Sequence, residues 1–262
     1  MGMTRAQSSF FEQNGYVVVE NLVPYETLSE LRQRVDDIQN TILDAQAAAR
    51  KRAANANGGG GGKSVEFIVE SSGGGAATAV RPSLRKLADL APVDPYFRSV
   101  AATPEILSIV SECTGGGPKI MLYSDQVFLK PAFCGSEKPL HQDNSYFKVM
   151  PMTAGVTCWM ALDDATVENG CMHYIPGSHK LGLIKHKEIK NTPHLVPDVD
   201  YKFNPQIPVP IPAGACIFHS LLTLHSSKAN SSARSRRAWA LHYANRSAES
   251  SVKEWSEILA LN

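Results

Sequence analysis

The sequence predicts an α+β fold that is mainly β, with N-terminal helices packed on an antiparallel double sheet. Apolar residues recur at helical spacing within the first 50 residues, whereas short strand-like runs separated by Gly, Pro, Asn and Ser dominate from about residue 118. Helices followed by many short strands indicate an α+β chain built on a sandwich or barrel. At 262 residues, the chain is expected to form a single domain, residues 1–262.

The N-terminal part is expected to contain two helices with a strand between them. Residues 5–14 and 24–48 are predicted to be helical, and the β-branched run "GYVVVENLV" between them is predicted to be a strand. The second helix has one apolar face, formed by Leu28, Leu31, Val35, Ile38 and Ile42. This face is expected to pack on the rest of the domain.

Two Gly- and Ala-rich segments, at about 49–64 and 71–79, are expected to be flexible loops because they have too few apolar residues to pack. The first contains "GGGGGKS" at 58–64, which resembles a phosphate-binding loop. However, Asn57 stands where that motif requires its first Gly, and no hydrophobic strand precedes it. Nucleotide binding is therefore not expected.

The remaining elements are short. The segments 81–100 and 103–115 are predicted to be helices with N-terminal Pro or Ser/Thr caps. Strand-like composition then follows in five segments, at 118–131, 153–166, 170–179, 214–227 and 236–245.

Bulk composition excludes several classes of protein. The net charge of +1 does not predict a nucleic-acid-binding surface, and the five cysteines lack the C-x-x-C spacing of a zinc ribbon. The sequence contains no run of about 18 apolar residues, so a membrane span is not expected. The N-terminus lacks the apolar run of a signal peptide. We therefore expect a soluble, intracellular and most simply cytoplasmic protein.

The stretch "KPLHQDNSYF", residues 138–147, contains a candidate metal site. On a strand, His141 and Asp143 would point to the same face. His225, at the end of an apolar run, is the preferred third ligand, and His219 competes with it for this role. Two His and one carboxylate leave three coordination positions open, as in the non-haem Fe(II) oxygenases.

The strand expected at 236–245 would supply a cation for a co-substrate carboxylate. Oxygenases of this kind need a two-electron donor, commonly 2-oxoglutarate, and a guanidinium can bind its distal carboxylate with two hydrogen bonds. Arg236 shares one face with Ala238, Ala240 and His242, which leaves room for a ligand, whereas Arg237 shares the bulky face with Trp239. Arg236 is therefore the preferred clamp, although both arginines could be surface charges.

These motifs resemble the phytanoyl-CoA dioxygenase family of Fe(II)- and 2-oxoglutarate-dependent oxygenases. The resemblance rests on "PLHQDNSYF", "WMALDDATVENGCMHYIPGSHK" and "HSSKANSSARSRRAWALHY", and extends over most of residues 116–245. The opening "FFEQNGYVVVENLV" is similar as well. The middle block is most similar to the phytanoyl-CoA dioxygenase domain-containing branch of the family.

The resemblance implies a double-stranded β-helix (jelly-roll) core with Fe(II), 2-oxoglutarate and O2 as cofactor and co-substrates, and with ascorbate as a candidate activator. It implies that the iron ligands are His141, Asp143 and His225. It places Arg236 and Ser227 on the 2-oxoglutarate carboxylate and Trp159, Gln126 and, through a gapped alignment, Lys86 beside the co-substrate. Trp159 could instead be a core residue, and Gln126 an ordinary strand residue. His173 and His179 are expected to be structural or rim residues.

The expected function is a dioxygenase that hydroxylates a small organic or acyl substrate and releases succinate and CO2. Asp143 favours hydroxylation over halogenation, since halogenases of this scaffold have a small residue in place of the carboxylate ligand. The alternative is a cupin-like metal-binding jelly roll without oxygenase activity. The substrate is expected to be a small molecule, either an acyl-CoA or a small metabolite. Lys180, Lys185, Lys187 and Lys190 could form a basic rim for CoA, or a solvated loop.

Overall fold

The structure is a computed structural model that describes residues 2–53, 66–69, 83–116, 119–199, 203–245, 247–252 and 259–261. The segments expected to be flexible loops lie largely outside the described residues, including all of 58–64 and 71–79. Within the described ranges, no helix is long and apolar enough to cross a membrane.

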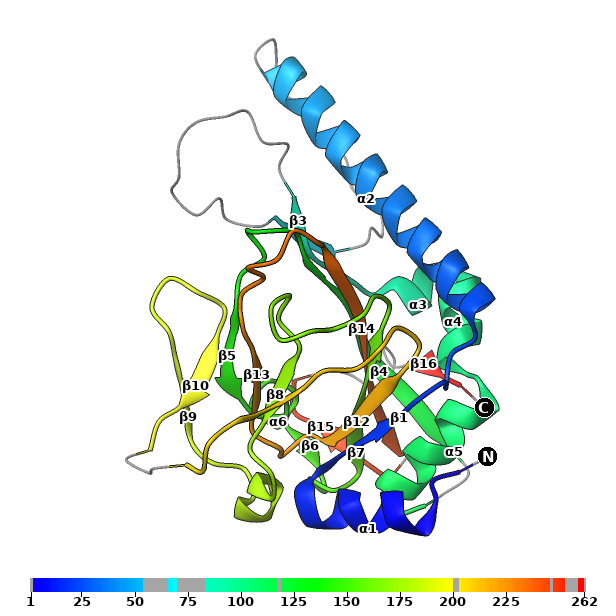
Figure 1. Cartoon of the computed structure of the whole chain (residues 1–262), viewed down its shortest axis with the longest axis vertical. Coiled ribbons are helices and arrows are strands. Elements are labelled where there is room, and N and C mark those ends of the chain that lie inside the picture. Colours follow the sequence, from blue (N-terminus) through cyan, green and yellow to red (C-terminus); the bar gives the residue numbers. More distant parts are fainter. Residues whose placement is uncertain are drawn as a thin grey trace.

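The core consists of two antiparallel sheets that face each other as a jelly roll, which confirms the predicted fold class (Figure 1). The larger, eight-stranded sheet has the order β1 (Tyr16–Val19), β12 (Cys216–Ser220), β7 (Gly155–Ala161), β14 (Arg236–Asn245), β4 (Ile120–Lys130), β3 (Leu84–Ala88) and β2 (Glu66–Val69), with β16 (Leu259–Ala260) also pairing with β4. The four-stranded sheet has the order β11 (Ile207–Val209), β8 (Met172–Tyr174), β13 (His225–Ser227) and β5 (Lys138–His141). Two small ribbons pair β9 (His186–Glu188) with β10 (Leu195–Pro197), and β6 (Val149–Met150) with β15 (Glu249–Ser250).

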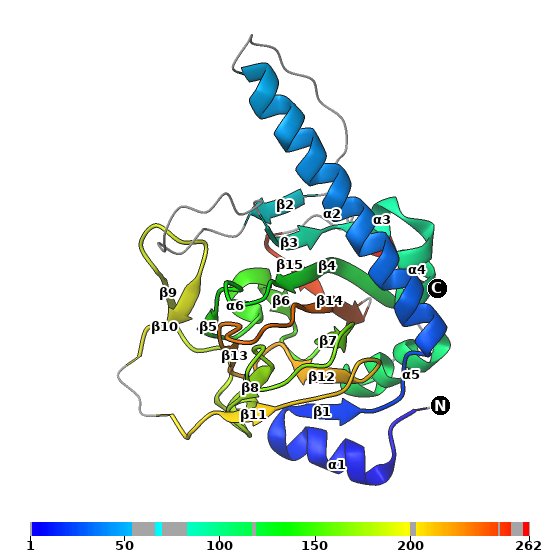
Figure 2. The same cartoon turned by 45° about the horizontal axis from the view of Figure 1, so that its top comes forward.

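Helices cover the outer face of the larger sheet (Figures 1 and 2). They are α1 (Arg5–Asn14), α2 (Tyr25–Ala53), α3 (Leu90–Val93), α4 (Pro95–Ala101) and α5 (Pro104–Cys113), while α6 (Asn144–Phe147) and a 3-10 turn (Ser178–Leu181) lie elsewhere. Leu28, Leu31 and Val35 of α2 are buried in the same cluster as Trp239 of β14, so the predicted apolar face does pack. Each such buried side chain contributes roughly 1.5–3 kcal/mol.

Both N-terminal helices form as predicted, and their ends have local causes. Thr4 and Gln7 form a reciprocal capping box at the start of α1, and Gly15 ends this helix with a left-handed backbone (φ 79°) that Gly adopts without strain. The second helix extends to Ala53, so the loop expected from residue 49 begins later than predicted.

The helical prediction for residues 81–100 is wrong in its first part and right in its second, where α3 and α4 form. Residues 81–100 are predicted to be helical from the Pro and Ser at their start, but Leu84–Ala88 forms strand β3. Lys86 pairs with Phe128 of β4, and the strand also accepts β2 as a partner. Pairing with the exposed edge of the sheet therefore overrides the local helical pattern, and helix begins only at Leu90.

The two faces of β14 differ as its sequence predicts. Trp239, Leu241 and Tyr243 lie in the core cluster beneath the helices. Ala238 and Ala240 lie on the opposite face, in the cluster between the two sheets. The small residues leave space between the sheets, and the candidate site occupies this space.

Candidate active site

Three buried side chains converge between the sheets. His141 ends β5, His225 begins β13, and the ladder places these two residues directly opposite each other. Asp143 Oδ1 lies 3.4 Å from His141 Nε2 and 3.5 Å from His225 Nε2. One ligand atom from each residue lies within 4.8 Å of the others, which is a spacing that a single metal ion can span.

Asp143 reaches this point by a different route from the predicted one. It does not continue the strand of His141, because β5 ends at His141 and Asp143 has helical backbone angles (φ −59°, ψ −37°) immediately before α6. The same-face argument for residues two apart on a strand is therefore wrong here. The turn into α6 brings the carboxylate to the imidazole instead.

The two histidines are held in the tautomer that suits a metal ligand. His141 Nδ1 lies 2.8 Å from the carbonyl of Pro139, and His225 Nδ1 lies 2.9 Å from the carbonyl of Thr223. Because a carbonyl only accepts, each Nδ1 carries the proton and each Nε2 presents a lone pair. Burial also lowers the pKa of both imidazoles, which favours the neutral form that binds metal.

The carboxylate remains ionised in this buried position. Burial would raise the pKa of Asp143, but the imidazoles of His225, His141 and His219 offset this effect and hold the pKa well below its ordinary value. Two neutral imidazoles and one carboxylate fit Fe(II) with open positions for other ligands.

The second carboxylate oxygen is held by His219, which competes with His225 in the sequence as a candidate ligand, and by Thr157, which the sequence does not indicate. Asp143 Oδ2 lies 3.0 Å from His219 Nε2 and accepts a hydrogen bond from Thr157 Oγ1 at 2.7 Å. His242 Nδ1 lies 2.9 Å from Thr157 Oγ1, and the Tyr174 hydroxyl lies 2.9 Å from His219 Nδ1. His219 therefore supports the carboxylate rather than joining the triad. Nothing in "GVTCW" marks Thr157 for this role.

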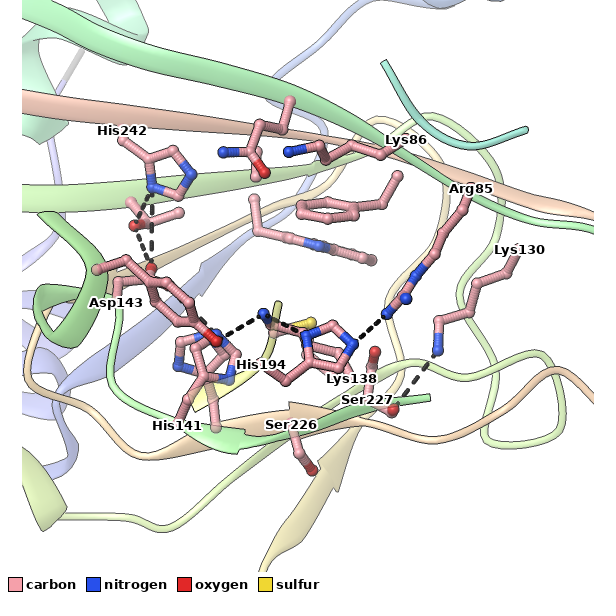
Figure 3. A pocket seen from close by; sticks show the side chains of 18 of the residues that line it. Arg85, Lys86, Lys130, Lys138, His141, Asp143, His194, Ser226, Ser227 and His242 are labelled. Carbon is pink, nitrogen blue, oxygen red and sulfur yellow. Dashed lines mark hydrogen bonds and ion pairs between the residues drawn. The ribbon is translucent and has the colours of Figure 1, made fainter. Parts of the chain in front are cut away.

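A cavity of about 350 Å³ opens beside the triad (Figure 3). Arg236 lies at its wall with 1 % of its surface exposed, and its Nη2 donates to the Gly170 carbonyl at 2.7 Å. Within the described part of the chain, Arg236 Nε has no acceptor. Burial lowers the pKa of Arg236 to about 10, so it remains a cation near neutral pH. A buried guanidinium with unused donors fits an incoming carboxylate.

The other predicted co-substrate residues line the same cavity. Trp159 lies beneath Arg236, whose Cζ is 5.3 Å from the centre of the indole ring, and Ser227 is buried at the end of β13. Gln126 of β4 and Lys86 of β3 also line the cavity, from the same sheet as Trp159 and Arg236. The fold therefore brings all the predicted site residues to one cavity.

Residues expected to lie outside the site do so. Arg237 points away from the cavity and donates to Asp163 and Asp36 at 2.8–3.0 Å. His173 and His179 are not part of the triad, and each makes a hydrogen bond with a backbone carbonyl.

A jelly roll that contains two histidines and an aspartate around one point, beside a buried arginine, defines the class of non-haem iron oxygenases. The phytanoyl-CoA dioxygenase (PhyH) family matches residues 11–238, and the chain belongs to this family. The predicted family and enzyme class are thereby confirmed: the protein is a 2-oxoglutarate-dependent non-haem iron dioxygenase.

Curated relatives include proteins named as phytanoyl-CoA dioxygenases and proteins named as phytanoyl-CoA dioxygenase domain-containing. The chain is 28% identical over 254 residues to a probable phytanoyl-CoA dioxygenase of Caenorhabditis elegans. This match covers 93% of this chain and 76% of that one. It is 31% identical over 156 residues to phytanoyl-CoA dioxygenase domain-containing protein 1 of Mus musculus. This match covers 57% of this chain and 53% of that one.

Among solved structures, the non-haem α-ketoglutarate-dependent carbocyclase SnoK from nogalamycin biosynthesis has a similar fold. The TM-score is 0.71 with 21% identity, and the match covers 99% of this chain and 97% of that one.

Proposed function

We propose that this protein hydroxylates a small organic or acyl substrate with Fe(II), 2-oxoglutarate and O2, and releases succinate and CO2. His141, Asp143 and His225 are the proposed iron ligands. Arg236 and Ser227 are proposed to bind the distal carboxylate of 2-oxoglutarate, with Trp159, Gln126 and Lys86 along the co-substrate. The observation that carries the proposal is the buried Arg236, which has an unused donor in the same cavity as the triad.

Each residue contributes a definite task. Bound iron with 2-oxoglutarate supplies the oxygen-dependent oxidation, in which one oxygen atom enters succinate and the other enters the substrate C–H bond. The Pro139 and Thr223 carbonyls orient the two imidazoles, while His219 and Thr157 hold the carboxylate. Arg236 orients the co-substrate, and the Trp159 ring packs against the Arg236 guanidinium.

The experiment is an anaerobic titration of the Fe(II) protein with 2-oxoglutarate, followed by visible absorption. A weak visible band that appears when 2-oxoglutarate is added, as expected for chelation of the iron by a 2-oxo acid, supports the proposal. Glutarate, which has the same two carboxylates but no keto group, is the control and should give no band. An unchanged spectrum with 2-oxoglutarate would contradict the proposal and favour a metal-binding jelly roll without oxygenase activity.

Turnover and substrate class can then be measured as succinate release in the presence of O2 and ascorbate. Acyl-CoA thioesters and small acids form the substrate panel. The predicted basic rim offers limited support for CoA, because Lys185 and Lys187 both pair with Asp198 at 3.1 Å. Stimulation above the substrate-free rate identifies the class.

A further inference from the structure

A cationic cluster lines the same cavity as Arg236, and none of its members belongs to the proposed iron or 2-oxoglutarate sites. We call Arg85, Lys138, Tyr146 and His194 the Arg85–Lys138 cluster (Figure 3). Lys138 Nζ lies 3.0 Å from the Tyr146 hydroxyl and 3.3 Å from His194 Nδ1. Arg85 Nη2 lies 2.9 Å from His194 Nε2, so the four side chains form one continuous chain of contacts.

This cluster has more hydrogen-bond donors than acceptors. A guanidinium only donates, so His194 Nε2 must accept from Arg85, which leaves the proton of the neutral imidazole on Nδ1. The ammonium of Lys138, which also only donates, then faces this N–H. The Tyr146 hydroxyl already accepts from Lys138 and from the Leu195 backbone N–H at 2.7 Å, so its own proton is available to donate. An acceptor with several lone pairs would resolve the mismatch.

The charges in the cavity also indicate that the cluster requires an anionic acceptor. The cavity lining contains five Lys and Arg side chains but a single carboxylate, that of Asp143. Within the described ranges, the hydrogen bonds of Arg85 and Lys138 go to a backbone carbonyl, a hydroxyl and an imidazole, not to a carboxylate. The two carboxylates of 2-oxoglutarate are assigned to iron and to Arg236. The Arg85–Lys138 cluster therefore needs a separate anion.

The position and surroundings of the cluster indicate the size of that anion's carrier. Lys138 Nζ lies 4.5 Å from the centre of the Tyr146 ring, and this ring lies 5.6 Å from the His141 ring, so Tyr146 packs against both the ammonium and the triad. Phe128, Phe147 and Met172 add apolar surface to the same cavity. A volume of about 350 Å³ is small for a pocket that must hold both the co-substrate and the substrate.

We propose that the Arg85–Lys138 cluster binds the carboxylate of the substrate, and that the substrate is a compact, apolar carboxylic acid oxidised a few bonds from its carboxylate. This inference rests on the proposed function and specifies its substrate class. Arg85 and Lys138 donate to the carboxylate, and the Tyr146 hydroxyl adds a third donor.

The test is calorimetric binding of hexanoate, octanoate and phenylacetate to the anaerobic Fe(II) protein loaded with 2-oxoglutarate. Each acid is compared with its methyl ester, which keeps the apolar body without the charge, and hexanoate also with hexanoyl-CoA. At least one acid should bind tenfold or more tightly than its ester. K138M and R85M should each weaken that binding at least tenfold, whereas K138R should restore most of it. K119M removes the same charge from an exposed lysine outside the cavity and should have no effect.

Several results would overturn the inference. These are equal affinity for acid and ester, no binding of any acid, tighter binding of the CoA thioester, or unchanged acid affinity in both R85M and K138M. Weaker 2-oxoglutarate binding in K138M with unchanged acid binding would assign the cluster to the co-substrate. The visible band with 2-oxoglutarate is recorded first on the same samples. Its absence would contradict the proposed function, whereas its presence beside a failed acid test would contradict only this inference.

Discussion

His219 Nε2 lies 3.0 Å from Asp143 Oδ2, while the other oxygen of that carboxylate faces His141 and His225. One carboxylate therefore serves two purposes: Oδ1 is directed to the proposed metal position, and Oδ2 is held by the protein. Contacts of this kind fix the orientation of a ligand before the metal arrives.

Substitution of His219 by Leu should weaken metal binding by about 10–100-fold, the usual effect of losing an outer partner of a ligand. Calorimetric titration of the metal-free protein with Mn(II) under argon would measure this. The amide of H219Q can still donate to Asp143 Oδ2, so this variant should lose less affinity. Equal affinity in H219L and the wild type would contradict the assigned role.

Arg236 and Arg237 provide a matched pair of adjacent arginines with different tasks. R236M should weaken 2-oxoglutarate binding by about 10–100-fold, since a charge-assisted hydrogen-bonded pair contributes about 1.5–3 kcal/mol. The anaerobic spectral titration gives the dissociation constant directly.

R237M is the control for this variant, because it removes the same charge from the opposite face of β14. It should leave the 2-oxoglutarate dissociation constant within about twofold, yet lower the free energy of unfolding by about 1–2 kcal/mol through loss of the pairs with Asp163 and Asp36. Urea denaturation measures the second effect. If R237M alone weakened 2-oxoglutarate binding, the assignment of the two faces would be wrong.

Asp125 is a buried carboxylate that stabilises the fold. It accepts hydrogen bonds from the Leu90 N–H and Trp239 Nε1 at 3.0 Å and from the Ala91 N–H at 3.1 Å. D125A would leave three buried donors without an acceptor and should lower the free energy of unfolding by about 3 kcal/mol or more. D125N keeps one acceptor oxygen, so its loss, measured by the same urea denaturation, should be smaller.

The same residue predicts a pH dependence. Burial raises the pKa of Asp125 to about 6, although three hydrogen bonds oppose the shift. The folded protein therefore binds the proton more tightly than the unfolded chain, whose Asp pKa is about 3.9. As the pH falls from 7 to 4, wild type should gain stability relative to D125N by about 2 kcal/mol. The difference between the two urea-unfolding free energies tests this, because the other titrating groups cancel. If the difference in unfolding free energy between wild type and D125N became smaller on acidification, the raised pKa of Asp125 would be contradicted.

The sequence predicts much of the fold because its periodicity is local. The face of Leu28 in α2 and the alternation of Arg236 and Trp239 in β14 depend only on residues within one element. Leu84–Ala88 was not predicted as a strand, because its structure depends on pairing with β4, some 40 residues later. The local cap residues there predict a helix, but helix forms only from Leu90 onward.

The candidate site likewise contains residues that the sequence indicates and residues that only the folded chain brings together. His141, Asp143 and His225 stand in motifs, so the sequence indicates them, although the strand argument for Asp143 is wrong in detail. Thr157 and His194 stand in no motif. They reach the cavity because the fold places β7 and the segment before β10 along its lining. No pattern of neighbouring residues could reveal such contacts.

The register of the smaller sheet places His141 directly opposite His225. An ion bound by both imidazoles would cross-link β5 to β13 at one rung of a ladder that is only a few residues long. Opening of that ladder would then require release of the metal, so amide hydrogen exchange in these two strands should slow on metal loading while the helix-covered sheet changes little.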